Sequence, residues 1–219
     1  MKVIQISELG GPEVLVYKEV KEPEVSDDQA LVDIKAIGVN YTDVYTRTGM
    51  TPSKVPVIPG VEAAGIVLQA GKGVTEVKEG DLVAYTGAMG SYAERAAVPS
   101  WRLVKVPDGL SAEDSAAAML QGSTAHYLSQ TIYPIVEGDT SLVHAGAGGV
   151  GLLLIQMVKA RGGRVIATVS TDEKALLAKE AGADYVVVYS REDFLSSVMQ
   201  ITDNKGLEVV YDAVGATTF

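Results

Sequence analysis

Residues Thr140–Val169 read TSLVHAGAGGVGLLLIQMVKARGGRVIATV. The stretch begins with a short apolar run, passes through a glycine-rich turn into an apolar helical pattern, and ends in a β-branched run. Gly146, Gly148 and Gly151 have the spacing G-x-G-x-x-G, and the whole has the length of about 30 residues that a βαβ unit requires. The stretch therefore predicts a strand, a tight turn, a helix and a second, parallel strand.

The glycines of this turn predict a dinucleotide site. The spacing alone is weak, because glycines also serve any tight connection between a strand and a helix. Within a βαβ unit, however, they let the backbone approach a pyrophosphate, whose charge the free amides at the helix start can hold. Gly151 would also allow helix and strand to pack closely.

The end of the second strand bears on the choice between NAD and NADP. NAD enzymes usually place an acidic residue about 20 residues after the glycines, where it binds the ribose hydroxyls. Here Ser170 follows the strand; a serine does not repel a 2′-phosphate, and Lys174 can neutralise one. Two alternatives stay open: Ser170 caps the next helix in a box with Glu173, or Asp172 supports NAD. We favour NADP.

The composition predicts an ordinary globular protein, with 47% hydrophobic and 21% charged residues in a chain of 219. The net charge of −10 predicts an acidic surface that repels nucleic acid and anionic membranes, so we expect neither as a partner. The absence of cysteine excludes disulfides and thiolate metal sites. The chain has no leader-like segment and no apolar run of about 18 residues, so we interpret it as cytoplasmic.

The pattern changes between the two halves of the chain. The first half has short alternating runs between turn signals, which is typical of a β module. Ser111 and Asp114 then have the spacing of a helix cap before an alanine-rich segment, and strands alternate with helices from there on. We predict an α/β fold, with a β domain over residues 1–121 and a doubly wound dinucleotide-binding domain over residues 122–219.

The second half contains fewer strands than a full dinucleotide fold, which has six. The expected strands are residues 140–145, 164–169, 184–189 and 208–214. A sheet that stops there exposes an edge. We therefore expect the chain to be a fragment or a truncated product.

Five stretches, taken in order, carry a family resemblance: AIGVNYTDVYTRTG (36–49), IPGVEAAGIVLQAGKGVTEVKEGDLVAY (58–85), GSYAERAAVP (90–99), LQGSTAHYL (120–128) and LVHAGAGGVG (142–151). Together they resemble the zinc-free quinone oxidoreductases related to zeta-crystallin, in the medium-chain dehydrogenase/reductase superfamily. The resemblance extends over nearly the whole chain.

The resemblance implies a GroES-like β domain followed by a Rossmann domain, with the active site in the cleft between them and a homodimer for the full-length protein. The last strands and the C-terminal segment of the family are absent from the sequence. The residues that the resemblance places around NADP(H) are Asn40, Tyr45 and Thr124 at the nicotinamide, Ala147, Gly148, Gly149 and Val150 at the pyrophosphate, and Ser170, Lys174 and Tyr189 at the 2′-phosphate.

The zinc-dependent relatives carry Cys where this chain has Asn40 and His where it has Val61. Their cysteine-rich lobe, which holds a structural zinc, is also missing. Only His126 and His144 remain, too few for a three-ligand catalytic zinc site. We expect no metal, and structural roles for both histidines.

Reduction of a quinone or an α,β-unsaturated carbonyl compound builds negative charge on the carbonyl oxygen. Without zinc, that oxygen needs hydrogen-bond donors, and the Tyr45 hydroxyl and the Asn40 amide are the candidate catalytic groups. Alternatively, Tyr45 is only an aromatic wall for the nicotinamide. Asp43 is expected to cap or orient the local helix.

Two other functions compete with this one. An enoyl-thioester reductase would share the tyrosine and the cofactor. A non-catalytic NADPH-binding or RNA-binding protein belongs to another class, although the acidic composition argues against RNA.

Overall fold

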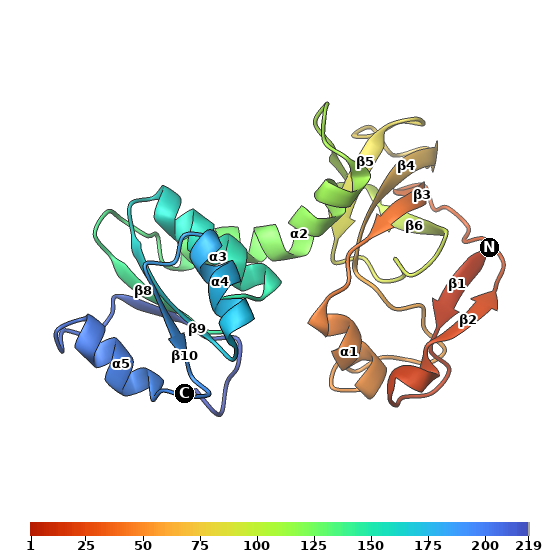
Figure 1. Cartoon of the computed structure of the whole chain (residues 1–219). Helices are drawn as coiled ribbons and strands as arrows, with labels where there is room; N and C mark the ends of the chain where they lie inside the picture. Colours follow the sequence, from red (N-terminus) through yellow and green to blue (C-terminus); the bar gives the residue numbers. More distant parts are fainter. Residues whose placement is uncertain (219) are drawn as a thin grey trace. The chain divides into compact units, whose positions relative to one another are not determined.

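The computed structural model describes residues 1–218, and the chain divides into two compact units (Figure 1). The first unit comprises Met1–Leu120, and the second begins at Gln121. The first is built mainly on antiparallel strands and the second on a parallel sheet covered by helices. This mixed α/β architecture is the predicted fold class.

The first unit is organised around a five-stranded antiparallel sheet with the strand order β6-β3-β4-β5-β7. A separate hairpin of β1 and β2 precedes it. The strands are β1 (Lys2–Gln5), β2 (Val16–Glu19), β3 (Gln29–Ile37), β4 (Glu62–Ala70), β5 (Leu82–Thr86), β6 (Arg95–Pro99) and β7 (Val104–Lys105), and the short 3-10 helices are η1 (Pro12–Val14) and η2 (Ser100–Arg102).

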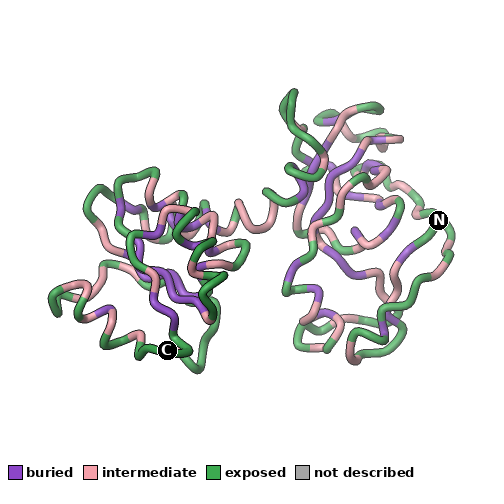
Figure 2. Tube along the Cα trace, viewed as in Figure 1, coloured by how far each residue is buried: buried purple, intermediate pink, exposed green. Residues whose placement is uncertain are grey.

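Alternate side chains of these strands form the core of the first unit. Ala30 and Val32 of β3, for example, point to the same side and are fully buried. They pack in one cluster with Val67 of β4 and Val83 and Tyr85 of β5. Figure 2 shows these buried stretches running through the middle of the sheet.

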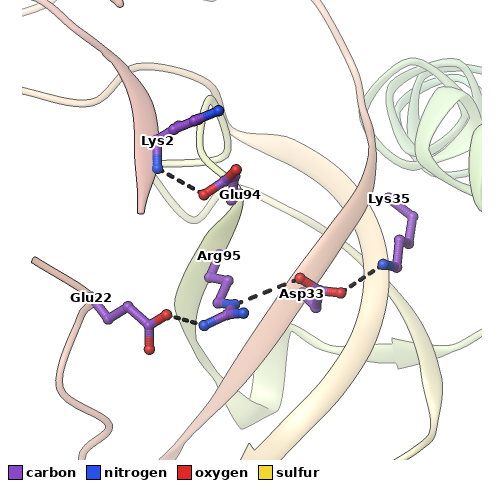
Figure 3. Close-up of polar contacts among 6 residues, drawn as sticks. All are labelled: Lys2, Glu22, Asp33, Lys35, Glu94 and Arg95. Atoms are coloured by element: carbon purple, nitrogen blue, oxygen red, sulfur yellow. Dashed lines mark hydrogen bonds and ion pairs between the residues drawn. The ribbon is translucent and has the colours of Figure 1, made fainter. Parts of the chain in front are cut away.

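Charged side chains on the surface link the hairpin and its following loop to the sheet (Figure 3). The Lys2 backbone N–H donates to the Glu94 carboxylate at 2.8 Å, and Arg95 pairs with Glu22. Asp33 of β3 lies between Arg95 and Lys35, at 3.7 and 2.6 Å. Because such exposed pairs stabilise a fold by at most about 1 kcal/mol each, the buried apolar residues contribute most of the stability.

Two helices complete the first unit. Helix α1 (Tyr41–Thr48) follows β3 and ends at Gly49, whose φ of 81° is left-handed. Helix α2 (Ala112–Tyr127) begins in the first unit, where Ala116 packs against Ala64 of β4. Its predicted cap is confirmed, since the Ser111 hydroxyl accepts from the Asp114 backbone N–H at 3.0 Å. A π-helical turn, η3 (Leu128–Ile132), continues α2.

The second unit contains a parallel sheet with the strand order β10-β9-β8-β11. Its strands are β8 (Thr140–Val143), β9 (Arg164–Val169), β10 (Tyr185–Val188) and β11 (Val209–Tyr211). Each lies within the residue range expected for it. The parallel pairing predicted from the glycine turn is confirmed, because Thr140–Val143 pairs in parallel with Arg164–Ala167.

Helices cover both faces of this sheet, as Figure 1 shows. They are α3 (Gly149–Ala160), α4 (Asp172–Glu180) and α5 (Phe194–Ile201). Val165 and Ala167 of β9 pack in one cluster with Ile155 of α3, whereas the intervening Ile166 packs with Val198 of α5. The strand is therefore apolar on both sides, as a doubly covered parallel sheet requires. Among the described residues, no helix is long and apolar enough to span a membrane.

Candidate functional site

The glycine turn joins β8 to α3, and no side-chain hydrogen bond caps the start of that helix. Gly148 is the N-cap, no side chain caps the helix, and its first turn contains no acidic residue. The Leu152 N–H donates to the Gly148 carbonyl at 2.9 Å, so the amides of Gly149, Val150 and Gly151 precede the helical hydrogen bonds. These amides and the helix dipole form a place where an anion can bind.

Close packing explains why two glycines of this turn are needed. A Cβ on Gly146 would lie 2.7 Å from the Ala167 Cβ of β9. A Cβ on Gly151 would lie 2.5 Å from the Ala145 carbonyl oxygen and 2.8 Å from that of Gly146. Ala145 itself has a left-handed φ of 51°, a conformation that costs a non-glycine residue about 1–2 kcal/mol. The turn therefore lies tightly against strand and helix.

The residue that caps α4 is not Ser170, the alternative left open by the sequence analysis. Ser170 does not cap this helix; Thr171 is the N-cap, and its hydroxyl accepts from the Lys174 backbone N–H at 3.3 Å. Because the helix begins at Asp172, Ser170 lies one residue too early for that role. Its hydroxyl instead accepts from the Lys174 Nζ at 3.2 Å.

The end of β10 brings Tyr189 to the same edge of the sheet. The Tyr189 N–H donates to the Val169 carbonyl at 3.0 Å, and the Ser190 hydroxyl donates to the Ser170 carbonyl at 2.9 Å. Ser170 and Tyr189, which the resemblance grouped with Lys174 around a 2′-phosphate, thus follow two neighbouring strands, and Lys174 lies at the start of α4.

A cavity of about 520 Å³ adjoins this edge. Its lining includes Tyr189, His144, Thr168 and Phe194. The His144 Nδ1 lies 2.8 Å from the Thr168 hydroxyl, and the His144 ring meets that of Phe194 edge-on at 5.0 Å. Burial lowers the pKa of His144, although the nearby Asp212 has the opposite effect. The lowered pKa favours a neutral imidazole and supports a structural role. His126 is exposed on α2.

Thr124 of α2 lies beside the glycine turn. Together with Gly148, Val150 and Leu154 it lines a second cavity of about 520 Å³. The second unit thus brings Thr124 and the turn residues to one cavity, which is compatible with the placement that the resemblance implied for them.

In the first unit, Asn40 and Tyr45 lie at the start and in the middle of α1. Asn40 is the N-cap, and its backbone N–H donates to the Asp43 carboxylate at 2.9 Å. The same carboxylate oxygen accepts from the Tyr92 hydroxyl at 2.8 Å. The orienting role expected of Asp43 is confirmed. Burial and the contact with Asp43 both raise the pKa of Tyr92, so this tyrosine remains protonated.

Tyr45 is half-buried, and its ring contacts that of the exposed Tyr41 edge-on at 5.2 Å. Part of the Tyr45 side chain therefore stays accessible from solvent. This position suits either interpretation made from the sequence, the hydrogen-bond donor or the aromatic wall.

Glu62 is a further member of this site that the sequence analysis did not single out. Its side chain is 1% exposed. The Asn40 Nδ2 donates to the Glu62 Oε2 at 2.6 Å, and the Leu120 backbone N–H donates to the Oε1 at 2.5 Å. The available signal was a carboxylate inside the otherwise apolar run VEAAGIVL of β4.

Comparison with known proteins places the chain in a family. Family models named "Alcohol dehydrogenase GroES-like domain" and "Zinc-binding dehydrogenase" match residues 26–108 and 149–219. The quinone oxidoreductase of Pseudomonas aeruginosa is 44% identical, over 100% of this chain and 68% of the relative. The chain belongs to the quinone oxidoreductase family. It is therefore a member of the medium-chain dehydrogenase/reductase superfamily, as the resemblance implied, and an oxidoreductase by class.

Two further members of the comparison are informative about chemistry. The solved structure of Escherichia coli quinone oxidoreductase complexed with NADPH has a TM-score of 0.96 and 40% identity, over 98% of this chain and 67% of that one. A 2-haloacrylate reductase of Burkholderia is 38% identical, over 97% of this chain and 66% of the relative. The chain thus spans about two thirds of the length of these relatives.

The residues present do not fit the zinc that the second family model is named for. Among the described residues, no group of three or more His, Cys, Asp or Glu side chains could hold a metal ion. At Asn40, where the resemblance implied a cysteine ligand in the zinc-dependent relatives, the side-chain amide donates to Glu62. Glu62 in turn has two N–H partners, so hydrogen bonds satisfy this buried carboxylate without a cation.

We expect Glu62→Ala to lower the free energy of unfolding by about 2–4 kcal/mol, because the Asn40 and Leu120 donors lose a buried acceptor. Glu62→Gln retains an oxygen acceptor and should cost less than half as much. Urea denaturation measures both values. Glu79→Ala, on the exposed surface of the same unit, is the control and should change stability by no more than about 0.5 kcal/mol. Equal losses in both Glu62 variants would contradict the assigned hydrogen bonds.

Proposed function

We propose that the chain binds NADPH and catalyses the NADPH-dependent reduction of quinones or α,β-unsaturated carbonyl compounds by hydride transfer, without a metal. The observation that carries the proposal is the Lys174–Ser170 contact after β9, at the edge of the sheet where α3 begins without a side-chain cap.

The glycine turn suits the pyrophosphate of a dinucleotide. The amides of Gly149, Val150 and Gly151 point out of the first turn of α3, and no carboxylate in that turn opposes an anion. A Cβ on Gly149 would collide with the side-chain amide of Gln121, which lies against the start of α3. An anion here also gains from the helix dipole, typically by about 0.3–1 kcal/mol at an exposed site.

The end of β9 suits the extra phosphate that distinguishes NADPH from NADH. The positive charge of Lys174 lies 3.2 Å from the Ser170 hydroxyl. Because Thr171 caps α4, the Ser170 hydroxyl does not serve as its cap. Tyr189, on the neighbouring strand end, offers an exposed aromatic ring. The NADPH in the similar Escherichia coli structure supports the same cofactor here.

The proposed substrate class is supported by the names of two relatives. Quinones and 2-haloacrylate both contain an electron-poor carbon–carbon double bond conjugated to a carbonyl or carboxylate group. Such a carbon accepts a hydride, and the electrons move onto the conjugated oxygen. A substrate of this class therefore needs an active site that stabilises a developing oxyanion.

When bound, NADPH supplies the hydride. The chain contributes hydrogen-bond donors for the oxyanion, and Tyr45 and Asn40 are our candidates. An asparagine amide carries two hydrogens; Glu62 accepts one from Asn40, which orients the amide and leaves the second hydrogen for a ligand. The Tyr45 hydroxyl carries an O–H that can donate a hydrogen bond to the developing oxyanion.

NADPH oxidation by the purified chain tests the proposal against its alternatives. The assay compares 1,4-benzoquinone, an enone and an enoyl thioester at equal concentration, with and without a metal chelator. Turnover of the quinone or the enone that the chelator does not affect is the expected result. Preference for the thioester would assign the enoyl-thioester reductase, and NADPH binding without turnover of any substrate would assign a non-catalytic protein.

We expect Lys174→Ala to weaken NADPH binding by about tenfold to a hundredfold, because a charge-assisted contact with the 2′-phosphate contributes roughly 1.5–3 kcal/mol. The affinity for NADH should barely change. Fluorescence titration with both cofactors measures the effect. Lys179→Ala, in the last turn of the same helix, is the matched control and should bind both like the wild type. An equal loss for NADPH and NADH would show that Lys174 does not read the phosphate.

We expect Tyr45→Phe to lower turnover by roughly tenfold to a thousandfold without changing NADPH affinity, because a donor to the developing oxyanion acts mainly in the transition state. Steady-state kinetics and cofactor titration separate the two effects. Tyr41→Phe, on the neighbouring exposed ring, is the control and should retain turnover. Unchanged turnover in Tyr45→Phe would leave Tyr45 as an aromatic wall.

A further inference from the structure

An ion pair involves the acidic residue beside the proposed 2′-phosphate site. Asp172, the first residue of α4, receives both arms of the Arg191 guanidinium. The distances are 2.9 Å from Nη1 to Oδ2 and 2.6 Å from Nη2 to Oδ1. Arg191 comes two residues after Tyr189, so the pair joins the segments that follow β9 and β10.

The surroundings of the pair are rich in negative charge. Glu173, Glu192 and Asp193 lie on the same two segments, and Lys174 and Arg191 are the cations there. The Asp193 carboxylate accepts from the Ser196 backbone N–H at 2.8 Å and so caps α5. A free Asp172 would therefore add to an acidic environment that disfavours a phosphate.

We infer that Arg191 determines the cofactor specificity of this chain by neutralising Asp172, and that this ion pair turns an NAD-type strand end into one that accepts the 2′-phosphate. The inference rests on the proposed use of NADPH and names a residue outside the Ser170, Lys174 and Tyr189 set.

The geometry of the pair supports this role in two ways. A carboxylate near the end of the second strand is the group that accepts the ribose hydroxyls of NAD. The guanidinium fork of Arg191 contacts both oxygens of Asp172, so a ribose hydroxyl has to compete with these charge-assisted hydrogen bonds. The positive charge of Arg191 also offsets the carboxylate charge that would repel the phosphate. Lys174 remains available, since its ammonium contacts Ser170 and not Asp172.

The test measures NADPH and NADH dissociation constants for the full 219-residue chain by fluorescence titration at low and high salt. The variants are Arg191→Gln, Asp172→Asn and the double variant Asp172→Asn/Arg191→Gln. Lys159→Gln is the matched control, because Lys159 forms an ion pair with Asp184 at the start of β10, at the opposite end of the strands. Thermal unfolding of each variant verifies that it is folded.

We expect Arg191→Gln to weaken NADPH binding by about fivefold to tenfold at low salt, with NADH binding unchanged or tighter, because Asp172 becomes free. The effect should shrink at high salt. The double variant should return to within about twofold of the wild type, since the charge that Arg191 offsets is then gone. Lys159→Gln should keep the wild-type ratio of the two constants.

Three results would overturn the inference. They are unchanged dissociation constants for both cofactors in Arg191→Gln, an equal loss for both cofactors in that variant, and a double variant as weak for NADPH as Arg191→Gln. The last result would mean that Arg191 contacts the cofactor directly. Failure of the proposed function is a separate outcome, because it would show in the wild type as preference for NADH or as binding of neither cofactor.

Discussion

The close approach of the glycine turn to β9 and α3 is the constraint on which the candidate cofactor site depends. A single Cβ at Gly146 or Gly151 would collide with Ala167 or with the backbone of the turn. Helix α3 begins directly after this turn, with Gly148 as its N-cap and no side-chain hydrogen bond capping it. The parallel pairing of β8 with β9 then brings the end of β9 to the same edge of the sheet. The start of α3 and the Ser170–Lys174 contact, the two features proposed to bind the cofactor phosphates, therefore lie at one edge of the sheet.

The first unit contains a buried carboxylate, that of Glu62. Glu62 is almost fully enclosed, and an unpartnered charge there would be strongly unfavourable. Two N–H donors, from Asn40 and Leu120, satisfy it. This arrangement links the strand β4 to the start of α1 and therefore fixes the direction of the Asn40 amide. Where the resemblance implied a metal ligand in the zinc-dependent relatives, this chain has a hydrogen-bonded pair.

The predictions from the sequence succeeded where a local pattern carries the information. The four strands of the second unit, the glycine turn and the Ser111 cap all follow from short segments whose periodicity or spacing has one favoured structure. The identity of the helix cap at α4 was less certain, because Ser170 and Thr171 are adjacent and both residue types cap helices. The homodimer, the cytoplasmic location and the roles of the site residues stay predictions.

The sequence by itself determined the order of elements, the family and the position of the glycine turn, because these depend on residues that are neighbours along the chain. Only the tertiary structure decided which polar and charged side chains contact one another. Glu62 contacts Asn40 across 22 residues, and Arg191 contacts Asp172 across 19. Neither separation corresponds to a helical or strand repeat, so the pairs exist only because sheet pairing brings distant segment ends together. The sequence shows which charged residues are available, and the folded sheet selects their partners.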